Sequence, residues 1–241
     1  MVNTSLTDIP NVETAHFVLF PPLESGDRLS RNEFERRYAA DPHIKKAELI
    51  EGIVYVASPL RFESHAEPHT WLITWLSIYQ ISTSGVRLGI EPTVRLDQDN
   101  EPQPDGVLLI DEVAGGKSRL SADDYIEGSP EMVVEIAASS AAKDLHDKKK
   151  AYQRNSIQEY IVWSIFENKL DWFCLEDGEY VLLAADATGV LKSKVFPGLW
   201  LSLPHLLTGD MAEVLNVLQA GLKTVEHIEF VKYLSDQSQR H

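Results

Sequence analysis

The chain has 241 residues, of which 44% are hydrophobic and 9% aromatic, so it is long enough to bury one sizeable core. Its single cysteine, Cys174, excludes an internal disulfide and fits a reducing cytoplasm, and the lack of any apolar run of about 18 residues excludes a membrane-spanning helix. A formal net charge of −15 disfavours tight binding of free DNA, because phosphate contacts need basic side chains. A local basic groove or a bound divalent cation would offset this charge.

Periodicity and turn residues predict alternating helices and strands. In the first half we expect an extended arm over residues 1–27 with a short strand at 16–19, a helix from Ser30 to Ala40, a strand or hairpin from Glu48 to Ser58, a helix from His65 to Thr83, and strands from Val86 to Leu96 and from Asp105 to Asp111. In the second half we expect a strand from Pro130 to Ala138, a helix capped by Ser139 or Ser140, a strand from Gln158 to Ile165, a hairpin of Lys169–Leu175 with Tyr180–Ala184, and helix from Leu203 until a disordered tail at Ser235–His241. This order predicts an α/β domain over residues 28–203, with a mixed central sheet flanked by helices, and a helical extension over 204–241.

Two acidic residues belong to short apolar segments that are typical of buried strands. Asp105 follows Pro104 at the start of one segment, and Glu135 lies inside the other, between Pro130 and Ala137. A carboxylate in such a strand is costly unless it is paired, protonated or bound to a metal. Two such acids on consecutive strands, followed by a helix that carries lysines, are the groups that metal-dependent cleavage of a phosphodiester requires.

The helix after Glu135 carries a candidate catalytic lysine. Asp144, Lys148 and Tyr152 are spaced four apart and therefore share one helix face, whereas Lys149 and Lys150 lie off it. From the residues alone, the favoured interpretation of Lys148 is a surface lysine paired with Asp144.

Glu48 and His65 are further candidates with open alternatives. Glu48 has the parity of the apolar residues in its strand, so it is either directed toward the core or a surface acid at a strand start. His65 and His69 have a spacing that zinc sites use, but no third ligand is obvious near them, so a zinc site is disfavoured; His65 is explained equally well by an approach to the active site or by a core or capping role.

Together these pieces resemble the bacterial family of putative restriction endonucleases in the PD-(D/E)xK nuclease superfamily. The matching segments, within roughly residues 28–203, are Glu48–Gly52, Gln103–Asp105, Val134–Ile136, Lys143–Leu145, Lys148, Tyr152 and Glu159–Val162. Each segment alone is common, but their order and spacing are fairly specific. The sequence departs from the superfamily pattern at Ala137, where a lysine is usual, and at Ala138-Ser139-Ser140, where relatives carry a Ser-Pro-Ser-Thr-like turn.

The resemblance implies a restriction-endonuclease-like core and a Mg²⁺-dependent endonuclease that hydrolyses phosphodiester bonds of DNA, with Mn²⁺ able to substitute. It implies that Asp105 and Glu135 bind the metal and that Lys148 replaces the lysine missing at position 137. Glu48 matches a glutamate of the family, which would bind a second metal or position water.

Two other functions fit the same residues. One is a catalytically inactive nuclease-fold protein that acts as a regulatory or protein-binding module, which the acidic charge and Ala137 favour. The other is an unrelated α/β binding protein whose acids are ordinary strand-end residues. We expect a cytoplasmic protein without membrane contact. We also expect a homodimer, because an apolar stripe at Met211–Leu218 and the aromatic-rich hairpin residues Asp171–Phe173 suggest surfaces that a second copy covers.

Overall fold

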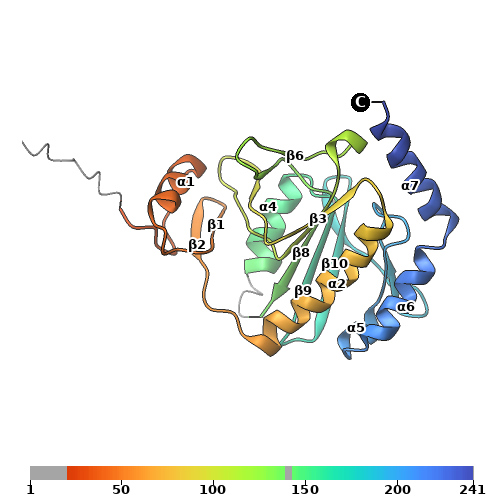
Figure 1. Cartoon of the computed structure of the whole chain (residues 1–241). Coiled ribbons are helices and arrows are strands. Elements are labelled where there is room, and N and C mark those ends of the chain that lie inside the picture. Colours follow the sequence, from red (N-terminus) through yellow and green to blue (C-terminus); the bar gives the residue numbers. More distant parts are fainter. Residues whose placement is uncertain (1–20, 139–142, 241) are drawn as a thin grey trace, which may run out of the picture.

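The computed structural model describes residues 21–138 and 143–240, and its centre is a six-stranded sheet with helices on both faces (Figure 1). The strand order is β11-β10-β9-β8-β5-β3. Strands β8 and β9 pair in parallel and the other neighbours pair antiparallel, so the predicted mixed sheet of an α/β fold is confirmed. The strands are β3 Val86–Ile90, β5 Gly106–Ile110, β8 Met132–Ala137, β9 Glu159–Ser164, β10 Lys169–Glu176 and β11 Glu179–Leu182.

Helices cover both faces of the sheet. They are α2 Glu67–Ser82, α4 Lys149–Arg154, α5 Leu203–Leu207, α6 Met211–Gly221 and α7 Val225–Ser238, whereas α1 Arg31–Ala40 packs against the N-terminal hairpin. Two π-helical turns, η1 Phe62–Ala66 and η3 Asp144–Lys148, lead directly into α2 and α4, and η2 Glu112–Ala114 is a short 3₁₀ turn. The predicted cap at Ser139 or Ser140 and the predicted strand at 16–19 lie outside the described residues.

Strand β8 divides the core, because successive side chains of a strand point to opposite faces. Val134 and Ile136 pack in the hydrophobic cluster that contains α2 and the C-terminal helices. Val133 and Ala137 pack in the second cluster, together with α4. Glu135 has the parity of Val133 and Ala137, so this acid is directed toward the α4 side of the sheet.

The N-terminal part forms a small unit with its own apolar cluster, built from α1 and the hairpin of β1 Ala47–Ile50 and β2 Ile53–Val56. Glu51 and Gly52 form the turn of this hairpin with φ angles of 52° and 70°, the positive values that a two-residue hairpin turn requires. Backbone hydrogen bonds of 3.1 and 2.8 Å join Leu49 to Glu101. This link places β1 beside the segment that leads into β5.

The predicted strand from Val86 to Leu96 is interrupted. Strand β3 ends at Ile90, Glu91 adopts a φ of 50°, and the chain resumes as β4 Val94–Arg95. Pro92 follows this bend, and proline cannot donate to a sheet ladder, which explains the break. Strand β4 instead joins a small sheet with β7 Ile126–Glu127 and β6 Arg119–Leu120, while β12 Val190–Lys192 pairs with β13 Trp200–Ser202.

The C-terminal helices pack on the sheet rather than forming a free surface. Val214 and Leu218 of α6 are buried in the main core, and Trp172 and Phe173 of the hairpin are buried too. Both surfaces that suggested a homodimer are therefore covered within the chain. The prediction of a disordered tail from Ser235 is wrong for its first residues, since α7 continues to Ser238. Among the described residues no helix is long and apolar enough to cross a bilayer.

Candidate active site

Asp105 lies directly before β5 and touches the neighbouring strand β8. Its Oδ2 accepts a hydrogen bond of 2.6 Å from the backbone N–H of Ile136. Because Gly106 pairs with Val134 in the antiparallel ladder, Asp105 stands beside Glu135. The two acids, predicted on consecutive strands, are therefore neighbours across paired strands.

Two cationic groups approach the other oxygen of Asp105. Nε2 of His65 lies 3.4 Å from Oδ1, and Nζ of Lys46 lies 3.8 Å from the same atom. Burial opposes ionisation of Asp105, but the His65 hydrogen bond and charge, together with Lys46, hold the pKa of Asp105 below its ordinary value. Nε2 of His69 is 2.8 Å from the backbone oxygen of Asp105, so His69 helps to fix this strand end.

Glu135 is buried on the α4 side of the sheet, and its Oε1 accepts two hydrogen bonds from that side. Nζ of Lys148 is 2.8 Å away and the hydroxyl of Tyr152 is 2.7 Å away. Burial raises the pKa of Glu135 to about 8; the charge of Lys148 opposes this rise, and the carboxylates of Asp144 and Asp105 add to it. The site thus has one carboxyl group that is unusually easy to protonate.

Lys148 is the centre of the cluster, and only 2% of the residue is exposed. Its Nζ lies 2.7 Å from Oε1 of Glu48, 2.8 Å from Oε1 of Glu135 and 3.7 Å from Oδ1 of Asp144. Burial alone would lower the pKa of Lys148, but these carboxylates raise it well above the ordinary value, so the ammonium stays charged. The interpretation of Lys148 as a surface lysine is therefore wrong, and its ammonium lies beside Glu135, as a replacement for a lysine at position 137 requires.

The helix start explains why Lys148 reaches the sheet. Asp144, Lys148 and Tyr152 share the face toward β8, as their spacing predicts, although Asp144–Lys148 forms a π-helical turn rather than α-helix. π-helical turns are rare in proteins overall, but those that occur are often found at functional sites. The ring of Tyr160 on β9 lies against that of Tyr152, with centroids 5.0 Å apart, and its hydroxyl donates to the backbone oxygen of Asp144 at 2.9 Å.

Glu48 enters the cluster from β1, and 5% of the residue is exposed, which excludes the alternative of a surface acid. Besides Lys148, it pairs with Nζ of Lys143 at 2.9 Å and accepts from the backbone N–H of Gln103 at 2.9 Å. Burial opposes ionisation, but the charges of Lys148 and Lys143 hold the pKa of Glu48 at about 2. Glu48 is therefore an ionised bridge between two lysines.

Sequence reasoning missed two lysines of the site, Lys46 and Lys143. Lys46 is two residues before Glu48, so the two share a strand face, and this parity could have indicated it. Lys143 lies inside the segment Lys143–Leu145 that resembles the family, but nothing in its own spacing indicated an ion pair with Glu48. Three lysines and His65 thus surround the acids, which explains how a chain of net charge −15 contains a locally balanced centre.

Comparison with known proteins shows the family to which this chain belongs. Residues 31–204 match the model of the Uma2 family, described as putative restriction endonuclease. The chain belongs to this family. Among solved structures, it is similar to the crystal structure of a putative nuclease belonging to DUF820 from Anabaena variabilis ATCC 29413, with a TM-score of 0.53 and 13% identity over 72% of this chain and 96% of that one. This likeness shows a shared fold; no curated protein matches the chain.

The three acids and the lysine of the predicted set fall inside the span matched by the Uma2 model, and the carboxylate oxygens among them suit a hard cation. Within residues 21–138 and 143–240 no three His, Cys, Asp or Glu side chains gather as a metal cage. Mg²⁺ often uses only one or two carboxylates and completes its shell with water and substrate phosphate, so the pair of Asp105 and Glu135 fits Mg²⁺. The neighbouring histidines do not make this a zinc site. His69 contacts the backbone oxygen of Asp105, and His65 faces the Asp105 carboxylate.

Proposed function

We propose that this Uma2 protein is a Mg²⁺-dependent endonuclease that hydrolyses phosphodiester bonds of DNA. The observation that carries the proposal is the buried ammonium of Lys148, held between Glu48 and Glu135 beside the strand-end Asp105. A buried cation with three acids stabilises a fold poorly, because desolvation costs about as much as the pairing returns. Such a cluster is therefore better explained by chemistry than by stability.

The proposal gives each residue a role. Asp105 and Glu135 would hold Mg²⁺, which, when bound, supplies polarisation of the phosphate and a more acidic bound water. Lys148 stays charged, so it would stabilise negative charge at the phosphate rather than take up a proton. Glu48, paired with both lysines, would keep Lys148 and Lys143 aimed at the same point.

Lys46 and Lys143 are suited to contact the DNA backbone. Their side chains are 25% and 20% exposed, whereas that of Lys148 is 3% exposed, so they form the accessible rim of the cluster. Lysine at such a rim binds phosphate as a point charge. A homodimer in the cytoplasm remains part of the proposal, because cleavage of both DNA strands uses two active sites.

A catalytically inactive, protein-binding role is the second candidate, and one observation favours it. In the described structure each acid of the cluster already faces a cation of the chain itself, so the site is balanced without metal. Under this alternative the cluster would be a fixed structural element and divalent cations would not compete for it.

Nicking of supercoiled plasmid in Mg²⁺ or Mn²⁺, with excess chelator as the blank, tests the proposal directly. Mn²⁺ binding measured on the same preparation separates the candidates. Metal binding with metal-dependent nicking supports the endonuclease. A well-folded protein that binds no Mn²⁺ at millimolar concentration and nicks no DNA supports the inactive module.

A further inference from the structure

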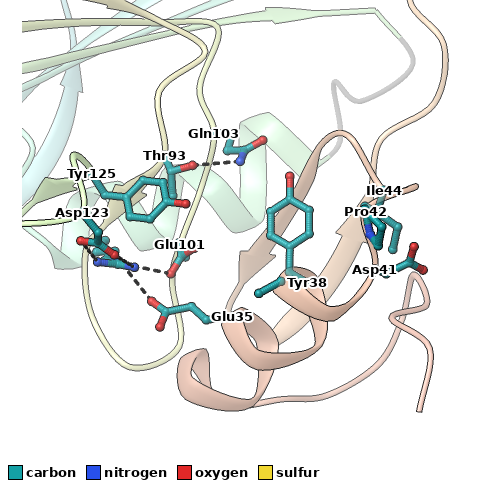
Figure 2. Close-up of a pocket in the computed structure, with 12 residues that line it drawn as sticks. Glu35, Tyr38, Asp41, Pro42, Ile44, Thr93, Glu101, Gln103, Asp123 and Tyr125 are labelled. Carbon is teal, nitrogen blue, oxygen red and sulfur yellow. Dashed lines mark hydrogen bonds and ion pairs between the residues drawn. The ribbon is translucent and has the colours of Figure 1, made fainter. Parts of the chain in front are cut away.

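A cavity of about 400 Å³ lies between the end of α1 with the segment after it and the loop segments around Thr93, Glu101 and Tyr125 (Figure 2). Its volume is within the range of small-molecule sites, which begins at roughly 300 Å³. No residue of the catalytic cluster lines it, so it is a separate space.

The polar side of the cavity is a carboxyl pair with one arginine. Glu101 is 4% exposed, and its Oε2 has no hydrogen-bond partner among the described residues. Nε of Arg95 lies 2.9 Å from Oε1 of Glu35 and 3.8 Å from Oε2 of Glu101, and its two terminal nitrogens each donate to Asp123 at 2.9 Å. Burial and the adjacent Glu35 raise the pKa of Glu101 to about 8, so at neutral pH Glu101 is largely uncharged.

Two aromatic rings form walls of the same space. Figure 2 shows Tyr38 and Tyr125 on either side of the hollow, with Glu101 and Thr93 between them. The guanidinium of Arg95 lies over the Tyr125 ring, 4.4 Å from its centroid, and the hydroxyl of Tyr38 donates to the backbone oxygen of Lys45 at 3.1 Å. Rings fixed in this way offer stacking surfaces for a flat group.

The cavity is joined to the catalytic cluster through one residue. The backbone N–H of Gln103 donates to Glu48, while its side-chain amide lines the cavity and donates to Oγ1 of Thr93 at 2.9 Å. A group bound in the cavity would therefore lie next to the strand segment that positions Glu48.

We propose that this cavity binds a single nucleobase that carries an exocyclic amino group, taken from an unpaired or flipped nucleotide next to the phosphate that is cut. The inference rests on the proposed nuclease function and names the part of the substrate that it recognises. A flat base stacks on a tyrosine ring, and its amino group donates to Oε2 of Glu101, because a carboxyl group accepts from base amino groups even when it carries a proton. A cationic ligand fits less well, because Arg95 already occupies the charged oxygens of Glu35 and Asp123.

The test measures binding of free nucleosides by NMR titration of the full chain in chelator, where no cleavage is needed. The probes are 2′-deoxyadenosine and the deoxynucleoside of purine, which differ only in the 6-amino group. We expect deoxyadenosine to bind about 10-fold more tightly, the effect of one buried hydrogen-bonding group. The same readout with agmatine tests a cationic ligand.

Variants tie the binding to this cavity. Tyr125→Leu should weaken deoxyadenosine binding several-fold, Tyr125→Phe should preserve it because the ring remains, and Tyr233→Leu, at an exposed tyrosine of α7, should leave it unchanged. Equal affinity for the two nucleosides, tighter binding of agmatine, or insensitivity to Tyr125→Leu would each overturn the inference. Because the titration is independent of nicking, a protein that binds deoxyadenosine here but cuts no DNA would refute the proposed nuclease and leave the base site standing.

Discussion

Nζ of Lys148 lies 2.8 Å from Oε1 of Glu135, a residue 13 positions earlier in the chain, and both side chains are buried. The parallel pairing of β8 with β9 leaves η3 and α4 to cross over the sheet, and this crossover brings the lysine back to the strand it has just left. A lysine two residues after Glu135 would project to the same side of the strand. Ala137 carries no charge at this position of the strand. Lys148, at the start of the following helix, therefore supplies the positive charge there instead.

Lys148→Ala should abolish metal-dependent nicking and also destabilise the fold. The variant leaves Glu48 and Glu135 buried without their shared cation, and breaking a buried pair in this way costs about 3–5 kcal/mol. The measurements are nicking rate and the free energy of unfolding in denaturant. Lys150→Ala, at an exposed lysine of the same helix, is the matched control and should change stability by less than about 0.5 kcal/mol.

Lys148→Met keeps the apolar stem and separates lost chemistry from lost folding. Its activity is measured at low temperature, where circular dichroism shows the protein folded. A folded Lys148→Met protein that nicks at the wild-type rate would contradict the assignment of Lys148.

Asp105→Asn should weaken Mn²⁺ binding by about 10-fold or more, because a neutral amide replaces a charged oxygen ligand. The affinity is measured by electron paramagnetic resonance of free Mn²⁺ during titration. Asp177→Asn, in the exposed β10–β11 turn, is the control and should leave the affinity unchanged. Identical Mn²⁺ affinities for the wild type and Asp105→Asn would remove this aspartate from the metal site.

Glu101→Gln should flatten the pH dependence of stability between about pH 5 and 8. The pKa of Glu101 is raised from 4.5 to about 8, so within this window the folded chain keeps a proton that the unfolded chain releases. Wild-type stability from this group is therefore lost as the pH rises, by at most about 1.4 kcal/mol per pH unit. Glu35 shares a hydrogen bond and a mutual charge effect with Glu101, so the difference between the two proteins reports the titration of this carboxyl pair.

Unfolding free energies at pH 5.5 and 7.5 supply the check. The advantage of Glu101→Gln over the wild type should increase from the lower to the higher pH. Parallel pH profiles of the two proteins would show that Glu101 ionises normally.

A homodimer is the remaining expectation, and light scattering at micromolar concentration measures it. The two surfaces that first suggested it are buried within the chain, so its support is the need for two sites to cut both strands. A monomer mass that persists in the presence of DNA would contradict it.

Local sequence patterns determined most of the secondary structure and the two strand acids. The apolar segments around Asp105 and Glu135 clearly indicated site residues, because a carboxylate in a buried strand is stable only when it is paired, protonated or bound to a metal. The face shared by Asp144, Lys148 and Tyr152 also followed from spacing alone. Turn chemistry located the hairpins, whereas Pro92 split a predicted strand that hydrophobicity alone had joined.

Only the tertiary structure decided which charges meet. Lys46 directly precedes β1 and Lys143 directly precedes η3, and the acidic partners of both lysines are far away in sequence. Whether Lys148 is on the surface or buried was equally undecided, since a lysine on a helix is stable in water and needs several carboxylates to be stable inside. Those carboxylates come from three separate elements, β1, β8 and η3, so their convergence on one ammonium follows from the packing of these elements and not from any one segment.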